Sequence, residues 1–340
     1  MRTLKCLVWD LDGTVWDGTL LEGGARSLRP GVADALRTLD GRGIVNSIAS
    51  RNDESLAMRR LEELGVAELF VEPRIAWVPK SASVAAIGGA LDIALDTVGF
   101  VDDDPFERDE VARAHPEVPL FDAADVASLV RRPELDPPVV TPEARRRRQM
   151  IRTATRRRRD EAEFEGTPED FLHTLGMELT VRPAAAGDLL RAEELTTRTS
   201  QLNSTGRVLA RERLAELAGS PDHLLVVADL EDVYGPYGTV GLALVERGDA
   251  SWTLDLLVVS CRVIARGIGT VLLHHLVRRA RADGAAMRAR LIPTARNRPM
   301  QITFRMNGFG EVERDGAAQV LEHAGDVPAE PPPWICLRVA

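Results

Sequence analysis

Short apolar runs alternate with helical patterns along the first 130 residues, and this alternation limits the fold more than any other property of the sequence. The expected strands are residues 4–9, 44–49, 69–71 and 97–101, and the expected helices are residues 31–42, 53–64, 81–91 and 105–114. Strands that are apolar along their whole length are buried on both faces, as in a parallel sheet covered by helices on each side. We therefore expect an α/β domain with a Rossmann-like parallel sheet over residues 1–131.

Polar and acidic residues stand where these strands end or where the next helix begins. Ligands of open α/β sheets collect at the carboxyl ends of the strands, so such residues are candidates for a shared site. In chain order the candidates are Asp10, Asp12, Ser50, Arg51, Lys80, Asp102 and Asp103.

Asp10 and Asp12 lie in the segment VWDLDGTVWDG at the end of the first expected strand. Because residues i and i+2 of a strand point to the same side, we expect both carboxylates to face one site. Asp10 is then a candidate nucleophile toward phosphorus. Asp12 is a candidate general acid and base that protonates the leaving oxygen and then activates water. Gly13 lets the chain turn close to this site.

The remaining candidates suit a phosphoryl group and a metal ion. Ser50 and Arg51 are expected to hold phosphoryl oxygens, and Lys80 is expected to offset the negative charge of nucleophile and phosphate. Mg²⁺ prefers hard oxygen ligands, which predicts a metal site built from carboxylates. Its expected ligands are Asp10, Asp12, Asp102 and Asp103. The alternative interpretation is that these aspartates are solvated surface groups or helix caps.

The ordered set of DxDGT, Ser, Lys and DD resembles the haloacid dehalogenase superfamily over residues 1–130. Asp12 and Ser50 are 38 residues apart, and Ser50 and Lys80 are 30 residues apart. The core elements nearly fill both intervals, so we expect no large cap domain. The site should therefore be open, and suited to a bulky substrate or to covering by the second domain.

The composition changes after residue 131. Residues 132–143 are rich in proline, and the arginine-rich stretch RRRRQMIRTATRRRRDEAEFE follows. We expect a linker with a helix over residues 132–167, whose arginines form either a solvated helix face or a docking surface for an acidic partner. Mixed strand and helix patterns then indicate an α+β domain over residues 168–340.

The stretch DLLVVSCRVIARGIGTVLLHHLVRRA predicts a strand, a glycine-containing turn and a long helix in this second domain. Backbone amides at such a helix N-terminus can cradle a pyrophosphate. With TARNRPMQITFRMNGF downstream, the region resembles the GNAT acyltransferase fold, which binds CoA. Two positions depart from that family. Ile264 replaces a polar residue of the pyrophosphate loop, and Phe304 replaces a tyrosine that serves as general acid.

Cys261 stands at the end of the strand before this helix, with Arg262 and Arg266 close in sequence. A helix N-terminus and nearby cations favour the nucleophilic thiolate form of a cysteine. The alternative for any single cysteine is an inert, small apolar side chain in a core, which we expect for Cys6 and Cys336. Three cysteines without paired spacing indicate neither a disulfide framework nor a zinc cluster.

The segments ELTTRTSQLNSTGR, VVSCRVIARG and IPTARNRP, together with the domain pairing, resemble the FkbH-like glyceryltransferase/phosphatases of polyketide biosynthesis. The resemblance implies that Cys261 takes the glyceryl unit of 1,3-bisphosphoglycerate as a thioester. The unit would pass to the phosphopantetheine thiol of an acyl carrier protein, and the aspartate site, with Mg²⁺, would remove the 3-phosphate. The residues implied for acyl and pantetheine binding are Arg198, Gln201, Asn203, Arg262, Gly267, Gly269, Thr294 and Asn297. Ser200 and Leu202 depart from the family's segment, which leaves the acyl unit open.

Three other functions stay open from the sequence. They are a stand-alone Mg²⁺-dependent phosphatase with a structural second domain, a CoA-dependent acetyltransferase, and a scaffold that only holds a carrier protein. A net charge of −9 does not suggest a general nucleic-acid binder. The first residues do not form a signal peptide, and no apolar run is long enough to span a membrane. We therefore expect a soluble, cytoplasmic protein.

Overall fold

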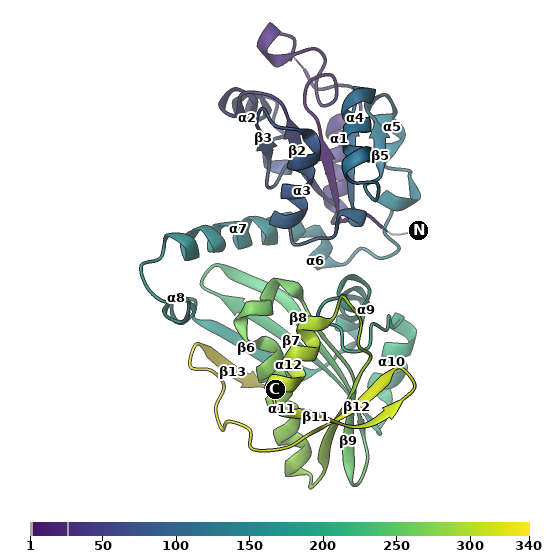
Figure 1. Ribbon diagram of the computed structural model, residues 1–340, viewed down its shortest axis with the longest axis vertical. Coiled ribbons are helices and arrows are strands. Elements are labelled where there is room, and N and C mark those ends of the chain that lie inside the picture. Colours follow the sequence, from purple (N-terminus) through teal and green to yellow (C-terminus); the bar gives the residue numbers. More distant parts are fainter. Residues whose placement is uncertain (1–2, 26) are drawn as a thin grey trace. The chain divides into compact units, whose positions relative to one another are not determined.

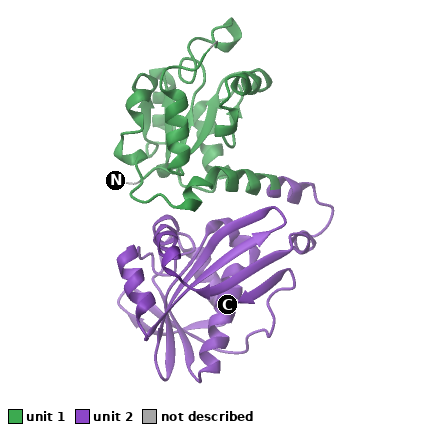
Figure 2. Cartoon of the chain, turned by 180° about the vertical axis from the view of Figure 1, so that it is seen from behind, with its two compact units in different colours: residues 1–156 green, residues 157–340 purple. Residues whose placement is uncertain are grey.

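The computed structural model describes residues 3–25 and 27–340 (Figure 1). The chain divides into two compact units, residues 1–156 and 157–340, which Figure 2 shows in different colours. The division falls inside helix α7 (Arg147–Glu163). The domain limits expected at residues 131 and 168 stay a prediction. Within the described residues, no helix is both long enough and apolar enough to cross a membrane.

Unit 1 contains a five-stranded sheet in the order β3-β2-β1-β4-β5, and every strand pair in it is parallel. Its strands are β1 (Cys6–Trp9), β2 (Val45–Ser50), β3 (Arg74–Ile75), β4 (Val98–Asp102) and β5 (Leu120–Asp122). The central strand β1 is buried along its whole length. This confirms the α/β class and the parallel sheet expected from the sequence.

Helices cover both faces of this sheet because successive side chains of a strand point to opposite faces. Leu7 and Trp9 of β1 pack into one core, and Cys6 and Val8 pack into the other. The longer helices of the unit are α1 (Val32–Gly41), α2 (Glu54–Glu63), α3 (Lys80–Ala90) and α4 (Pro105–Ala114). The shorter elements are η1 (Leu20–Glu22), η2 (Ala67–Leu69), η3 (Leu95–Thr97), η4 (Ala123–Asp125), α5 (Val126–Leu129), η5 (Pro133–Leu135) and α6 (Pro142–Arg145).

The strand expected over residues 69–71 is wrong. Leu69 ends the 3-10 turn η2, and Phe70 forms only an isolated bridge with Asn46. Glu72 then takes a left-handed backbone conformation, with φ of 48°, which stops the chain from extending. The pairing with β2 resumes later, at β3. Apolar residues of this segment pack into the core although they lie in a turn and a loop. A pattern of hydrophobicity does not distinguish such a loop from a strand.

The intervals between the strands of unit 1 hold no inserted domain in residues 3–25 and 27–156. Between β1 and α1 the described residues form the short turn η1 and two isolated bridges, Asp12 with Trp16 and Trp16 with Leu28, and α3 begins five residues after the end of β3. The expectation of a domain without a large cap is confirmed.

Unit 2 contains an eight-stranded mixed sheet in the order β11-β12-β10-β9-β8-β7-β6-β13. The pairs β9–β10 and β6–β13 are parallel, and the other pairs are antiparallel. Its strands are β6 (Met177–Pro183), β7 (His223–Asp232), β8 (Gly235–Arg247), β9 (Ser251–Val259), β10 (Ala286–Leu291), β11 (Phe309–Asp315), β12 (Ala318–His323) and β13 (Ile335–Val339). The mixed sheet with its helices confirms the α+β class expected for this part.

Two hydrophobic cores lie on opposite faces of the second sheet. Leu254 and Leu257 of β9 share a core with α11 (Ile268–Ala282), while Leu256 and Val258 share the other core with α9 and α10. The helical elements of the unit, besides the end of α7, are α8 (Pro168–Thr174), η6 (Ala186–Asp188), α9 (Leu189–Arg198), α10 (Arg211–Gly219), η7 (Cys261–Arg266), α11 and α12 (Arg298–Met306).

Candidate active site

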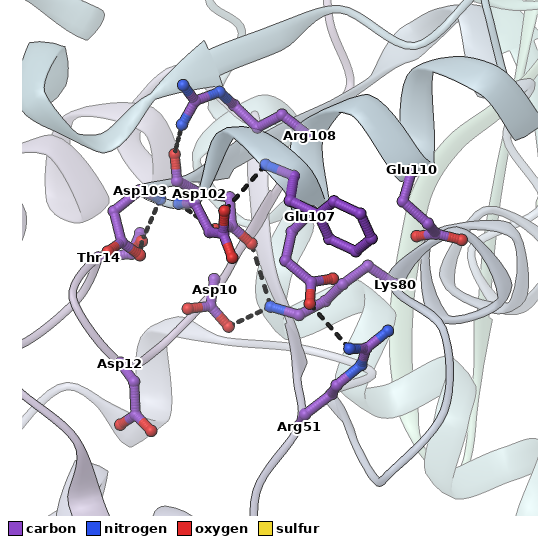
Figure 3. Close-up of polar contacts among 12 residues, drawn as sticks. Asp10, Asp12, Thr14, Arg51, Lys80, Asp102, Asp103, Glu107, Arg108 and Glu110 are labelled. Atoms are coloured by element: carbon purple, nitrogen blue, oxygen red, sulfur yellow. Dashed lines mark hydrogen bonds and ion pairs between the residues drawn. The ribbon is translucent and has the colours of Figure 1, made fainter.

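A buried lysine joins two buried carboxylates at the carboxyl end of the first sheet (Figure 3). Asp10 follows β1, and its backbone N–H donates to the carbonyl of Val101 on β4 over 3.0 Å. Lys80 opens α3, and its Nζ donates to Asp10 Oδ1 and, over 3.1 Å, to Asp102 Oδ2. Asp10, Lys80 and Asp102 are only 6%, 4% and 1% exposed, respectively. Of the residues expected at the site, Asp10, Lys80 and Asp102 therefore meet.

Burial controls the protonation of this group. It raises the pKa of Asp10 to about 7; the Lys80 ammonium opposes this increase, and the Asp102 charge adds to it to a smaller extent. Burial also raises the pKa of Asp102. Burial by itself lowers the pKa of Lys80, but the two carboxylates outweigh it and the net pKa lies above its usual value. Two carboxylates share one cation here, so the cluster favours a proton or a second cation.

Asp103 adds a third carboxylate, which Thr14 holds in place. The Thr14 hydroxyl donates to Asp103 Oδ1 over 3.2 Å and accepts from the Asp103 backbone N–H over 3.0 Å. Gly13 lies beside it with φ of 69°, and a Cβ atom there would overlap the Asp103 carboxylate. Glycine is therefore needed at position 13 both for the backbone conformation and for the close approach.

The carboxylates of Asp10, Asp102 and Asp103 suit a divalent cation. One oxygen of each lies within 4.8 Å of the others. Hard oxygen ligands, a surplus of negative charge and an exposed third carboxylate fit Mg²⁺, which binds through few carboxylates and keeps several waters. These three residues would hold the ion.

Asp12 does not join this set. Its Oδ1 accepts from Trp16 Nε1 over 2.6 Å and from the Leu20 backbone N–H over 3.0 Å, and its Oδ2 accepts from Asn52 Nδ2 over 3.0 Å. Figure 3 shows Asp12 apart from the Asp10 and Lys80 side chains. The Asp12 carboxylate therefore lies outside the cluster of Asp10, Asp102 and Asp103, and its expected part in metal binding stays a prediction.

The physical reason is that the chain leaves the extended conformation before Asp12. Strand β1 ends at Trp9, and the N–H groups of Thr14, Val15 and Trp16 all donate to the carbonyl of Leu11, over 2.8 to 3.3 Å. In such a tight turn, residues i and i+2 no longer share a side.

Ser50 and Arg51 stand at the end of β2, as predicted. Ser50 is buried and its carbonyl accepts from the Ala76 N–H. Arg51 Nη1 forms an ion pair with Glu107 Oε1 at 2.8 Å, and its Nε donates to the carbonyl of Val78 over 3.2 Å. Glu107 Oε2 is buried and has no hydrogen-bond partner among the described residues. Arg51 is thus held at the mouth of the site before any phosphate binds.

Sequence reasoning missed the residues of α4 that support the cluster. Arg108 donates to the carbonyl of Asp102 over 2.6 Å and pairs with Asp122 at 2.8 Å, which fixes the end of β4. Glu110 accepts from the Ser81 N–H over 3.0 Å and so holds the start of α3 beside Lys80. The charged run that follows Asp103–Asp104 was the available signal, but it does not tell which charges point toward the site.

Cys261 lies in unit 2 at the start of η7, directly after β9, and its side chain is half-buried. Arg262 Nη2 donates to the carbonyl of Tyr237 over 3.0 Å, and Arg266 pairs with Glu161 at 3.1 Å. Arg266 also lies 6.0 Å from the Phe171 ring centroid. Both arginines expected near the thiol therefore bind other protein groups as well.

Two asparagines expected to bind acyl or pantetheine groups are engaged with the backbone. Asn203 Oδ1 accepts from the Gly206 N–H over 2.8 Å, and Asn297 Nδ2 donates to the carbonyls of Asn203 and Ile292 over 3.1 and 2.9 Å. Both are buried. They join the segment before α10 to the segment before α12, so the structure gives them a bracing role.

The turn around Asn203 is followed by α10, which begins at Arg211. Thr294 is exposed and its hydroxyl accepts from the Asn297 N–H over 3.1 Å. Gln201 is half-buried, and Arg198 lies 4.0 Å from Glu194.

Of the two glycines near the start of α11, only one has a backbone conformation that requires glycine. Gly267 has φ of 79°, whereas Gly269 lies inside the helix and a Cβ atom there would meet only ordinary contacts, at 3.6 Å or more. Phe304 is fully buried and packs edge-on against Phe309, with ring centroids 5.3 Å apart. No hydroxyl is present at that position.

The other two cysteines differ from each other. Cys6 is fully buried in β1 and burial raises the pKa of its thiol, as expected for an inert core residue. The same expectation is wrong for Cys336, which is exposed. It lies on β13 at the edge of the second sheet, where alternation buries Ile335 and turns its neighbour to solvent.

No protein-family model and no curated protein matches this chain. Three similar solved structures each match less than half of it. The N-terminal part of a Bacteroides fragilis protein, which contains a phosphatase domain and was solved with Mg, is 26% identical with a TM-score of 0.34; the match covers 38% of this chain and 40% of that one.

The second structure is 3-deoxy-D-manno-octulosonate 8-phosphate phosphatase from Moraxella catarrhalis, with 22% identity, a TM-score of 0.27 and coverage of 34% of this chain and 64% of that one. The third is the PaiA N-acetyltransferase from Thermoplasma acidophilum with coenzyme A, with 16% identity, a TM-score of 0.35 and coverage of 43% and 98%.

Proposed function

We propose that this chain is a bifunctional glyceryl transferase and phosphatase that acts on 1,3-bisphosphoglycerate and an acyl carrier protein. Unit 1 would be a Mg²⁺-dependent phosphatase of the haloacid dehalogenase type, and unit 2 a GNAT-like acyltransferase that uses Cys261. The observation that carries the phosphatase half is the buried Lys80 between Asp10 and Asp102, with Asp103 beside them.

In the phosphatase half, an oxygen of Asp10 attacks the phosphorus of the 3-phosphate and the C3 oxygen leaves. Water then attacks the aspartyl phosphate, and phosphate departs. Bound Mg²⁺ would supply positive charge that offsets the phosphate and the carboxylates. Lys80 already supplies one buried cation, and Ser50 lies at the adjacent strand end to hold a phosphoryl oxygen.

Asp12 remains the proposed general acid and base. Its carboxylate would donate a proton to the C3 oxygen and later take one from the attacking water. Because Trp16, Leu20 and Asn52 donate to it, these hydrogen bonds would have to give way when a leaving group binds.

In the transfer half, the Cys261 thiolate attacks C1 of the acyl phosphate, the bond from C1 to the phosphate oxygen breaks, and inorganic phosphate leaves. The carrier thiol then attacks the thioester carbonyl, and the Cys261 sulfur departs. The half-buried position of Cys261, in contrast to the sealed Cys6, supports this role. Phosphopantetheine would come with the carrier.

Intact-protein mass spectrometry tests the proposal. Wild-type protein and Cys261→Ser are incubated with 1,3-bisphosphoglycerate, Mg²⁺ and holo carrier protein, with Cys336→Ser as the matched control for an exposed thiol. An acyl adduct, with or without its 3-phosphate, is expected on wild type and on the control, and a glyceryl adduct is expected on their carrier. Cys261→Ser should give neither. Carrier loading that survives Cys261→Ser would exclude the covalent step.

The main alternative is a stand-alone Mg²⁺-dependent phosphatase with a structural second unit. The contacts of Arg262 and Arg266 favour this alternative, because Arg262 donates to the Tyr237 carbonyl and Arg266 pairs with Glu161, which leaves less of their charge to act on the Cys261 thiol. Phosphate release that needs neither Cys261 nor a carrier would support it. A CoA-dependent acetyltransferase is disfavoured by the buried, hydroxyl-free Phe304.

A further inference from the structure

Within residues 3–25 and 27–156, five large apolar side chains are strongly exposed, and together they form what we name the apolar rim. They are Leu21, Leu56, Trp77, Val78 and Phe106. Trp77 is 68% exposed and Phe106 is 66% exposed. Single exposed apolar residues are ordinary on a protein surface, so their distribution decides whether they matter.

All five lie beyond the carboxyl ends of the parallel strands. Leu21 is in η1 after β1, and Leu56 is in the first turn of α2 after β2. Trp77 and Val78 lie between β3 and α3, and Phe106 is in the first turn of α4 after β4. Because the strands are parallel and adjacent, these loops emerge at one edge of the sheet, the edge that holds Asp10.

Hydrogen bonds connect the apolar rim to the candidate site. The N–H of Leu20, next to Leu21, donates to Asp12, and the carbonyl of Val78 accepts from Arg51. Arg51 also binds Glu107, the residue after Phe106. Rim residues therefore lie next to groups that the phosphatase reaction would use.

The reacting groups are recessed while the rim is not. Asp10, Lys80 and Asp102 are nearly inaccessible, whereas the two aromatic rings of the rim are mostly in solvent. A small, polar phosphate ester that reaches Asp10 would not cover these apolar side chains. A partner with a thin arm could use both the recessed cluster and the exposed rim. The arm would carry the phosphate to Asp10, and the body of the partner would contact the rim.

The size of the apolar rim indicates a transient partner. An aromatic side chain buries about 150–250 Å², so the five partly exposed side chains offer on the order of 500 Å². A stable interface buries about 800 Å² on each partner. The rim is too small for a permanent dimer and suits a partner that arrives, reacts and leaves.

Two hollows in unit 1 include a rim residue each. One of about 330 Å³ is lined by Phe106, Glu110, Arg113 and Ala114. The other, of about 300 Å³, includes Val78, Ile75 and Ala82 among its lining residues. Neither hollow includes Asp10, so they offer room for side chains of a partner and not for the phosphate itself.

We infer that the apolar rim is the docking surface for a carrier protein whose flexible pantetheine arm delivers a phosphorylated acyl group to Asp10. The inference rests on the proposed function, and it adds that phosphate is removed from the carrier-borne thioester. It assigns Trp77 and Phe106 as the main contacts, since they are the two large aromatic residues of the rim.

The test compares two substrates with the same reacting group. One is holo carrier protein loaded with 3-phosphoglycerate as a thioester, and the other is the same thioester on free pantetheine. Phosphate release is measured with the full chain, with Trp77→Ser/Phe106→Ser, and with Val312→Ser as a control on β11 of unit 2, where the side chain is 56% exposed. Melting curves verify that the variants fold.

We expect the double variant to lower kcat/KM at least 10-fold for the carrier substrate, through KM, and less than 2-fold for the pantetheine thioester. The control should change neither. Equal losses on both substrates, or no loss on either, would overturn the docking role. A rim variant that converts a dimer to a monomer in sedimentation would show that a second copy occupies the rim. Failure of wild type to release phosphate from the loaded carrier would instead refute the proposed function together with the docking role.

Discussion

Lys80 in unit 1 and Arg157 in unit 2 are both buried cations bound to buried carboxylates, but the charges around them are balanced differently. Lys80 serves two carboxylates, Asp10 and Asp102, with Asp103 close by. Arg157 serves one, Asp232, through two hydrogen bonds of 2.7 and 2.9 Å.

The second cluster is complete in itself. The Arg157 guanidinium lies 4.3 and 5.2 Å from the ring centroids of Tyr237 and Tyr234, and the Tyr237 hydroxyl donates to Asp232 over 2.9 Å. A planar guanidinium matches a carboxylate with two bonds, so no further cation is needed. The first cluster has surplus negative charge and raised carboxyl pKa values. Both clusters are buried and they differ in charge balance: only the first carries a surplus of negative charge that a bound cation could offset, which makes it the candidate for function.

The largest expected effect is the loss of phosphate release when the proposed nucleophile is removed. Asp10→Asn should lower phosphate release by at least ~10³-fold, because an amide cannot attack phosphorus. It should not lower the melting temperature of the metal-free protein, since it relieves the surplus charge. Asp17→Asn, at an exposed carboxylate of the same segment, is the matched control and should change activity less than ~2-fold. An Asp10→Asn variant with near wild-type turnover would contradict the assignment.

Arg157→Ala should give the opposite signature. It leaves the buried Asp232 carboxylate without its cation, and such a loss costs about 3–5 kcal/mol of unfolding free energy. Denaturant unfolding measures the cost, and phosphate release per folded molecule should not change. Arg159→Ala removes an exposed pair with Glu163 and should cost less than ~0.5 kcal/mol. Similar costs for the two variants would mean that the buried pair is not structural.

A smaller effect is expected in the pH dependence of the unfolding free energy, which also distinguishes the two clusters. The pKa of Asp10 rises from 3.8 to about 7 on folding, so the folded state holds a proton that the unfolded state has lost between those values. Stability from this group is therefore full below pH ~4 and falls as pH rises toward 7, by about 4 kcal/mol, because one pKa unit corresponds to about 1.4 kcal/mol. Calorimetry in EDTA should show this decline.

Mg²⁺ should reverse the effect, because a cation favours the ionised carboxylate. The rise in melting temperature on addition of Mg²⁺ should be larger at pH 8 than at pH 5, and Asp10→Asn should flatten the metal-free profile. A metal-free protein whose stability rises from pH 5 to pH 7 would contradict the unbalanced cluster.

Much of the first site could be predicted because parallel strands bring their carboxyl ends to one edge. Asp10 directly follows β1, Ser50 and Asp102 end the neighbouring strands β2 and β4, and Lys80 opens the helix after β3. Their placement at one edge of the sheet therefore depends only on strand order. The departure of Asp12 could not be predicted, since it depends on the turn in which three N–H groups share the Leu11 carbonyl.

The ion pairs of Arg51 and Arg108 that support the site could not be predicted from the sequence pattern. Arg51 pairs with Glu107, 56 residues away, and Arg108 pairs with Asp122 at the end of β5. Both arginines lie in charged segments whose sequence by itself indicates a solvated surface. The selection of one partner among many depends on which helix face packs toward the site.

By itself the sequence determined the class of each unit, the polar residues at the strand ends and a set of candidate ligands for Mg²⁺ and phosphate, because apolar periodicity and residue chemistry are local properties. Only the tertiary structure decided which carboxylates share Lys80, that Asn203 and Asn297 brace the backbone, and that Cys336 faces solvent. These outcomes depend on turns, on strand register at a sheet edge and on charge balance after burial, which arise from contacts between residues far apart in the chain.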